Sequence, residues 1–237
     1  KAPYYCMMHD FGITQDYLVL HIVPSIGSWD RLEKGMPHFG FDTSLPVYLG
    51  IIPRRDGVTE GDIRWFKRDN CFASHVFNAF QEGTRIHIDV PEAQNNMFPF
   101  FPDVHGAPFD PAAAASRPTR WTVDLASNSD AFDAVTRLSE AVGEFPRIDD
   151  RFAGQPYRYG WMLEVNQTRP VDTAVRSISG MLLNSLCLID FSTGKEQHWW
   201  CGSASTLQEP CFVARSKNAP EGDGWIIQIC NRIDLQR

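Results

Sequence analysis

Long apolar runs are missing from this sequence. A helix that crosses a bilayer needs about 20 consecutive apolar residues, whereas the longest apolar run, residues 180–189, is shorter and contains Asn184 and Ser185. A basic excess is missing as well, because 22 Lys and Arg residues face 29 Asp and Glu residues and give a net charge of -7. Phosphate binding requires a basic surface. We therefore expect no transmembrane segment and no nucleic-acid partner.

The sequence also lacks the common patterns of metal and disulfide frameworks. Its six cysteines are widely scattered and form no CxxC pair, which argues against a zinc site built on such pairs. It contains neither an HExxH motif nor a two-histidine, one-carboxylate spacing. Reduced and mostly buried thiols are the better interpretation of the cysteines, so we expect a cytoplasmic location.

What the sequence does contain is a series of short β-type segments. Several of them alternate apolar and polar residues, as half-buried strands do, and turn sequences such as residues 55–57 and 192–195 separate them. The expected strands cover residues 17–23, 47–52, 63–66, 84–90, 120–125, 160–165, 186–191 and 225–230. This pattern predicts an antiparallel all-β protein, for which a sandwich, a barrel and a propeller all remain open.

Helical patterns are rare. We expect one helix over residues 129–142, where apolar residues recur at a rough helical spacing and Ser129 can cap the first turn. A short helical turn is expected around Leu32, and loops are expected over residues 95–105 and 108–118. Because no linker divides the chain, we expect residues 1–237 to form a single, partial domain.

Seven histidines are the first candidates for chemistry, because imidazole is a common metal ligand. A lone histidine is more often an ordinary surface or core residue. His21, His87 and His198 lie in expected strands and are interpreted as solvated or structural. His38 and His105 are interpreted as loop residues. His9 and His75 differ because of the residues around them.

Four motifs, spread over most of the chain, surround the remaining candidates. Residues 8–17 read MHDFGITQDY and residues 72–80 read FASHVFNAF. Residues 144–149 read EFPRID, and residues 209–215 read EPCFVAR, followed by Asp-Gly-Trp at 223–225. In this order the four motifs resemble those of the carotenoid cleavage oxygenase family, most closely the branch that cleaves lignostilbene and resveratrol. Residues 37–42, 48–50 and 53–55 carry the resemblance to that branch.

The resemblance implies part of a seven-bladed β-propeller with a helical or loop cap over an iron site. It implies that His9 and His75 are Fe(II) ligands and that Glu144 and Glu209 hydrogen-bond ligand histidines. Neutral imidazole suits Fe(II), and a carboxylate on the second ring nitrogen fixes the tautomer. Without the resemblance, Glu144 is most simply interpreted as a helix-end charge near Arg147, and Glu209 as a solvated loop residue.

The implied activity is O2-dependent cleavage of a conjugated C=C bond in a small, apolar, phenolic stilbene, which yields two aldehydes. Cleavage of an apocarotenoid or carotenoid is an alternative, and a non-catalytic binding propeller is an alternative of another class. The aromatic residues Phe98, Phe100 and Phe101 fit either a substrate tunnel or core packing. Two of the four family ligand histidines and the phenol-binding residues have no counterpart here, so we expect a fragment that is inactive alone.

Overall fold

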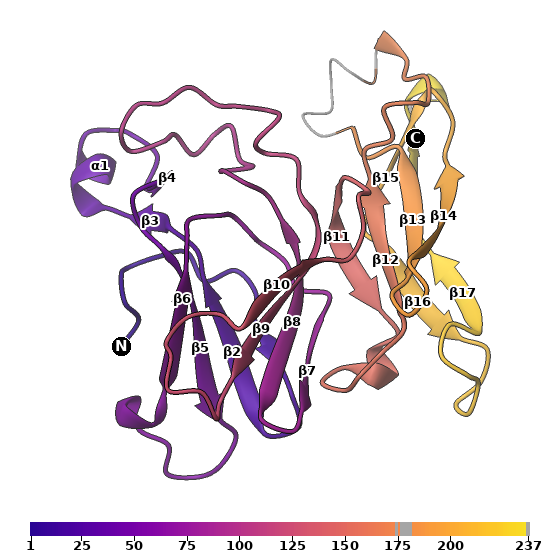
Figure 1. Cartoon of the computed structure of the whole chain (residues 1–237). Coiled ribbons are helices and arrows are strands. Elements are labelled where there is room, and N and C mark those ends of the chain that lie inside the picture. Colours follow the sequence, from indigo (N-terminus) through magenta and orange to yellow (C-terminus); the bar gives the residue numbers. More distant parts are fainter. Residues whose placement is uncertain (174, 176–181, 236–237) are drawn as a thin grey trace.

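The chain folds into antiparallel β-sheets that follow one another in sequence order (Figure 1). This computed structural model describes residues 1–173, 175 and 182–235. The first sheet has the order β1-β2-β5-β6. Its strands are β1 (Gly12–Ile13), β2 (Tyr17–Ile22), β5 (Val47–Pro53) and β6 (Arg64–Arg68).

The second and third sheets are four-stranded meanders, with the orders β10-β9-β8-β7 and β11-β12-β13-β14. The second consists of β7 (Asn78–Glu82), β8 (Arg85–Glu92), β9 (Arg117–Asp124) and β10 (Ala134–Arg137). The third consists of β11 (Gly143–Ile148), β12 (Tyr159–Glu164), β13 (Ser185–Asp190) and β14 (Lys195–Trp200). Four-stranded meanders that repeat along a chain are typical of propeller blades.

The smaller elements complete the description. Three two-stranded ladders pair β3 (Ser25–Gly27) with β4 (Phe39–Phe41), β15 (Ser205–Leu207) with β18 (Cys230–Arg232), and β16 (Cys211–Ala214) with β17 (Gly224–Ile227). The helical turns are α1 (Trp29–Glu33), η1 (Glu60–Asp62), η2 (Asp150–Phe152) and η3 (Ile233–Leu235). Among the described residues, no helix has the length and apolar character needed to span a bilayer.

The first strand of each four-stranded sheet contacts a strand of a neighbouring sheet, and these contacts define a shared region. Strand β1 contacts β7, and β11 contacts both β8 and β16. Because each sheet starts at this shared region and steps outward strand by strand, residues that begin each sheet converge although they are far apart in sequence. The long segment between β8 and β9, drawn in magenta, arches over one end of the first two sheets (Figure 1).

Apolar side chains fill the spaces between neighbouring sheets. The largest core cluster joins the first two sheets and includes Leu49, Phe66, Ile88 and Trp121, all fully buried. A second cluster, around Phe77 and Met162, joins the second and third sheets. Burial of each such side chain contributes about 1.5–3 kcal/mol, so packing between the sheets holds the site region in place.

The all-β prediction is confirmed, and most expected strands coincide with observed ones. The helix expected over residues 129–142 is wrong: Ala134–Arg137 instead forms β10, which pairs with the free edge of β9 in the register Val135↔Trp121. Val135 is 44% exposed, so the apolar spacing does not mark a buried helical face. The unpaired edge of β9 supplies backbone hydrogen-bond partners, and these outweigh a weak helical pattern.

Three further expectations have clear outcomes. The short turn around Leu32 is α1, capped by the Ser28 hydroxyl. The loop expected at 108–118 ends two residues early because β9 begins at Arg117. Part of the apolar run at 180–189 lies outside the described residues, and Ser185–Asp190 forms β13.

All six cysteines are free thiols, of which Cys71 and Cys187 are buried and Cys211 is exposed.

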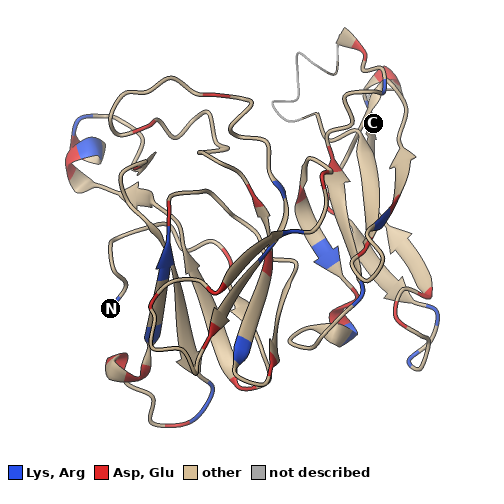
Figure 2. Cartoon of the chain, in the orientation of Figure 1, with Lys and Arg blue, Asp and Glu red and all other residues tan. Residues whose placement is uncertain are grey.

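Acidic and basic residues are interspersed over the ribbon (Figure 2), but one ion pair is buried. Asp89 on β8 is fully buried and accepts two hydrogen bonds of 2.8 Å from Arg120 on β9. It also accepts one of 2.7 Å from the hydroxyl of Tyr157, which precedes β12. The carboxylate therefore connects the second sheet to the third.

We expect Asp89→Ala to destabilise the protein strongly, since it leaves the Arg120 guanidinium without its partner. Breaking a buried pair in this way costs about 3–5 kcal/mol. The free energy of unfolding, from denaturant titration of the full-length protein, is the measurement. Asp133→Ala is the control, because Asp133 pairs with Arg85 on the surface, where both side chains are about half exposed. Equal midpoints for the two variants would contradict the assignment.

Candidate metal centre

Two histidines meet where the first and second sheets begin. His9 lies three residues before β1, and His75 lies three residues before β7. Because β1 contacts β7, the two rings approach each other at 4.9 Å between centroids and 72° between planes. Their Nε2 atoms are 3.1 Å apart.

The residues around His9 hold this approach in place. The Asp10 carboxylate accepts the Val76 backbone N–H at 2.9 Å, which ties the His9 segment to the His75 segment. Thr14 donates its hydroxyl to Gln81 Oε1 at 2.9 Å and accepts the Tyr17 backbone N–H at 3.0 Å. The motif at residues 8–17 is therefore a positioning device: its Asp and Thr connect it to the second sheet.

A buried carboxylate fixes the orientation of His75. Glu144, on β11, is 1% exposed and its Oε2 lies 2.6 Å from His75 Nδ1. The same carboxylate accepts the Ser74 hydroxyl at 3.0 Å and the Phe145 backbone N–H at 2.8 Å. Because a carboxylate accepts hydrogen bonds, the His75 ring proton lies on Nδ1. In the neutral ring the lone pair is then on Nε2, which faces His9 Nε2.

Phe145 shows backbone strain beside this carboxylate. Its φ of 56° is the one positive value among the described non-glycine residues, and the β11–β12 register shifts between Glu144 and Arg147. Bulges and left-handed residues of this kind are frequent at functional sites. The bulge lets the Phe145 ring cover His75, with 5.1 Å between ring centroids.

The protonation of His75 reflects two opposing effects. Burial disfavours the imidazolium, but the hydrogen bond and negative charge of Glu144 outweigh burial and raise the pKa of His75. In the metal-free protein the ring therefore keeps its second proton to a higher pH than an ordinary histidine does. A metal ion that binds Nε2 must displace that proton.

Asn78 explains the second motif. Its amide nitrogen donates to the carbonyls of Phe152 and Gln155, and its amide oxygen accepts the Gly154 N–H at 3.0 Å. Gly154 has φ of 80°, which glycine adopts without strain. Asn78 thus fixes the loop that leads into β12.

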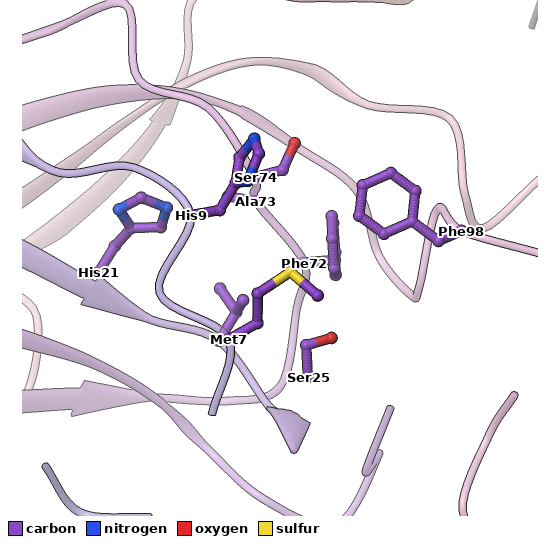
Figure 3. Close-up of a pocket in the computed structure, with 9 residues that line it drawn as sticks. Met7, His9, His21, Ser25, Phe72, Ala73, Ser74 and Phe98 are labelled. Atoms are coloured by element: carbon purple, nitrogen blue, oxygen red, sulfur yellow. The ribbon is translucent and has the colours of Figure 1, made fainter. Parts of the chain in front are cut away.

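A small cavity adjoins His9. It measures about 10 Å³, enough for one water molecule, and is lined by residues that include Met7, His9, His21 and Phe98 (Figure 3). His9 and His21 lie on one side of the view, and Phe72 and Phe98 lie on the other. His21 is 4% exposed, its Nδ1 has no hydrogen-bond partner, and burial lowers its pKa. His21 is therefore buried and neutral, not solvated.

An apolar cleft of about 450 Å³ begins next to Glu144. Gly143 and Val142 line one side, and the segment between β8 and β9 lines the other with Met97, Phe98 and Phe100. The volume lies within the range of small-molecule sites, about 300–1,000 Å³. The segment that arches over the sheets thus touches both this cleft and the His9 cavity, as expected for a cap.

Glu209 stands apart from the other three candidates. It precedes β16, the next strand at the shared region, and its carboxylate pairs with Arg147 at 2.7 Å. The side chain is 44% exposed. In the described part of the chain the structure thus brings together His9, His75 and Glu144, while Glu209 contacts Arg147 instead of a histidine.

The geometry of the two imidazoles fits a metal ion. Two nitrogens that each lie about 2.1 Å from one ion, at right angles, are about 3.0 Å apart, close to the observed 3.1 Å. The Glu144–His75 hydrogen bond is the arrangement that orients metal-ligating histidines in many proteins. His9 and His75 could therefore hold a metal beside an apolar cleft.

The fold and site together define an all-β protein with imidazoles at the start of successive sheets. The family description "Retinal pigment epithelial membrane protein" matches residues 1–237. The chain therefore belongs to this family, the carotenoid oxygenase family that the four motifs indicate.

Individual relatives are similar over nearly the whole chain. It is 54% identical over 234 residues to lignostilbene-alpha,beta-dioxygenase isozyme III of Sphingomonas paucimobilis, covering 98% of the chain and 48% of that protein. It is 38% identical to isoeugenol monooxygenase of Pseudomonas putida over 237 residues, 100% of the chain and 48% of the relative. The chain thus spans about half the length of these curated relatives.

Solved structures agree. A lignostilbene dioxygenase of Pseudomonas brassicacearum superposes with a TM-score of 0.93 at 35% identity, covering 100% of this chain and 49% of that one. A mutant of Synechocystis ACO superposes with a TM-score of 0.79 at 23% identity, over 99% of this chain and 46% of that chain. These likenesses confirm the propeller fold class.

We expect Glu144→Gln to lower the pKa of His75 in the metal-free protein, because the variant loses the negative charge that stabilises the imidazolium. The deprotonation midpoint should move to lower pH, as measured by NMR titration of the ring resonances. The resonances of His105, which contacts Asp42, should be the same in both proteins. An unchanged His75 midpoint would show that Glu144 does not control this ring.

Proposed function

We propose that the full-length protein is a non-haem Fe(II)-dependent dioxygenase that cleaves the central C=C bond of a stilbene-type phenylpropanoid. The proposal assigns His9 and His75 as iron ligands, with Glu144 holding His75. One observation carries it: two Nε2 atoms lie 3.1 Å apart, and a buried carboxylate holds the Nδ1 atom of one of these rings. Without a cation between the rings, that contact requires a proton on one of the two Nε2 atoms.

The chain supplies half of such a site. We propose that residues 1–237 are the central part of a seven-bladed propeller and that two further ligand histidines come from the rest of the protein. Glu209 lies two residues before β16, the next strand at the shared region, and it would hold one of those histidines. Its half-exposed carboxylate is accessible for that contact.

Iron bound at this position would supply O2 activation. The chain's own residues have other tasks. Glu144 keeps Nδ1 of His75 protonated, so that Nε2 can bind the cation. Phe145 covers the His75 ring on one side. Met97 and Phe98 line the adjoining cleft and exclude water from the space where an apolar substrate would lie.

Two observations favour a stilbene as the substrate. Three relatives of this chain act, by their names, on lignostilbene, isoeugenol and resveratrol. The cleft combines aromatic and aliphatic walls with few polar groups, among them Ser116 and Gln167. Such a surface fits a planar diaryl ethene. A cytoplasmic location remains a prediction from the cysteine content.

A non-catalytic binding propeller is a weaker alternative. A binding surface does not require Glu144, which is buried with three donors directed at it. Burying a carboxylate is costly unless its partners are kept. A buried carboxylate that holds one histidine, which in turn faces a second histidine, is typical of metal sites.

In the full-length protein, His9→Ala or His75→Ala should abolish activity and sharply lower the iron content, since each removes one of four proposed ligands. Iron per protein, measured by atomic emission alongside turnover, tests this. His105→Ala is the matched control, because His105 contacts a carboxylate, Asp42, away from the site. Full activity in either site variant would refute the ligand assignment.

We expect the full-length protein to convert a 4-hydroxystilbene into two aromatic aldehydes with consumption of O2. Chromatography of the products and an oxygen electrode provide the measurements, with β-apocarotenals as the competing substrates. Zinc should not support turnover, because it has no redox chemistry. Turnover under strict anaerobiosis would exclude a dioxygenase, and exclusive cleavage of apocarotenals would assign the alternative substrate.

A further inference from the structure

A second carboxylate–histidine pair lies on the outer part of the third sheet. Glu164 on β12 is 7% exposed, and its Oε2 lies 2.9 Å from Nδ1 of His198 on β14. This repeats the Glu144–His75 arrangement. The Nδ1 proton is fixed by the carboxylate, and Nε2 is left as the free ring atom.

Two further potential metal ligands lie near His198. Glu196 Oε2 lies 3.4 Å from His198 Nε2, and Cys187 pairs directly with His198 across β13 and β14. One ligand atom from each of Cys187, Glu196 and His198 lies within 4.8 Å of the other two. Within residues 1–173, 175 and 182–235, this is the one such group of three.

Two hydrogen-bond acceptors of the cluster, His198 Nε2 and Glu196 Oε2, lie close to each other. If His198 is neutral, its Nε2 lone pair faces the Glu196 carboxylate, and two acceptors repel at that distance. Ser139 donates its hydroxyl to Glu196 Oε1 at 2.5 Å, which turns Oε2 toward the histidine. The Cys187 side chain is fully buried, and its recorded partner is a weak contact of 3.9 Å to the Leu188 carbonyl. A cation placed between Nε2 and Oε2 would replace this repulsion by attraction to both atoms.

The distance between His198 Nε2 and Glu196 Oε2 fits a cation of the zinc type. A nitrogen and an oxygen that each lie about 2.05 Å from a tetrahedral ion are about 3.3 Å apart, compared with the 3.4 Å observed here. Thiolate, imidazole and carboxylate together select borderline divalent ions over calcium or magnesium. The His198 side chain is 37% exposed, which leaves a route of entry and room for water as a fourth ligand.

This cluster is separate from the His9–His75 site. Paired residues of antiparallel strands share a face, and neighbours along a strand alternate. Glu144 pairs with Leu163, whereas Glu164 pairs with Gly143 and Ser185. Glu144 and Glu164 therefore lie on opposite faces of the third sheet. Cys187 and His198 share the face of Glu164, since Cys187 lies two positions beyond Ser185 along β13.

We propose that Cys187, Glu196 and His198 form a second metal site that binds Zn2+ or a similar divalent d-block ion, with Glu164 orienting His198. Binding replaces the S–H bond of Cys187 by a metal–sulfur bond and releases the proton to solvent. Burial and the charges of Glu164 and Glu196 raise the pKa of the Cys187 thiol, so the thiol holds this proton until an ion arrives. The site joins β13 to β14 and is independent of the proposed dioxygenase activity.

Cobalt(II) is the probe, because a cobalt–thiolate bond gives a charge-transfer absorption that a site made of histidines cannot give. Co2+ titrated into the iron-loaded, full-length protein should produce this absorption with one equivalent bound, and excess Zn2+ should remove it. Cys187→Ser should abolish the band. His198→Gln and Glu196→Gln should each weaken Co2+ binding at least tenfold, and Glu164→Gln should weaken it about 10–100-fold.

Matched variants separate this site from other thiols and histidines. Cys211→Ser removes an exposed thiol, and His105→Gln breaks a histidine–carboxylate pair that has no thiol nearby; both should leave the band intact. Iron content and turnover should also be unchanged in His198→Gln, which lies on the surface and should fold normally. Absence of the band, or a band that survives both Cys187→Ser and His198→Gln, would overturn the proposal. The contacts of His198 with Glu164 and Glu196 would then be structural only.

Discussion

The hydrogen bond between Glu144 and His75 is the interaction on which the candidate centre depends. A carboxylate that is almost fully buried is stable only while donors surround it, and Ser74, His75 and Phe145 supply these donors. This requirement explains the bulge in β11 and the left-handed backbone of Phe145. It also determines which nitrogen of His75 is free. The chemistry of the site thus follows from satisfying one buried charge.

The sheets provide the frame for that interaction through a simple regularity. The four candidate residues all lie at or just before the first strand of a sheet or ladder: His9, His75, Glu144 and Glu209. Each of these first strands contacts a strand of a neighbouring sheet or ladder. The outer strands carry no such residues for the first centre. They carry instead the buried Asp89–Arg120–Tyr157 contacts and the packed apolar clusters that hold neighbouring sheets together.

Much of the fold and of the candidate site could be predicted from the sequence, because the motifs contain the residues whose side chains make specific hydrogen bonds. Asp10 accepts the Val76 N–H, and Asn78 both donates and accepts through its amide. The helix expected at 129–142 failed because spacing alone does not distinguish a buried helical face from an exposed edge strand, and the deciding partner, β9, comes earlier in the chain. For His21 the sequence left a solvated and a structural role open, and the structure shows it buried. Its alternation with buried Val19 on β2 was the available indication of burial. The pairing of Glu209 with Arg147 was not predicted, because the motif around Glu209 carries no indication of which residue lies opposite it.

The separation of the two imidazoles along the chain would link a metal ion at this position to folding. His9 and His75 are 66 residues apart in sequence, and their approach requires two sheets to form and dock. An unfolded chain has no such preformed pair, so the free energy of binding an ion between the two rings would add to the free energy of folding. An ion at this position would therefore fasten the first two sheets to each other.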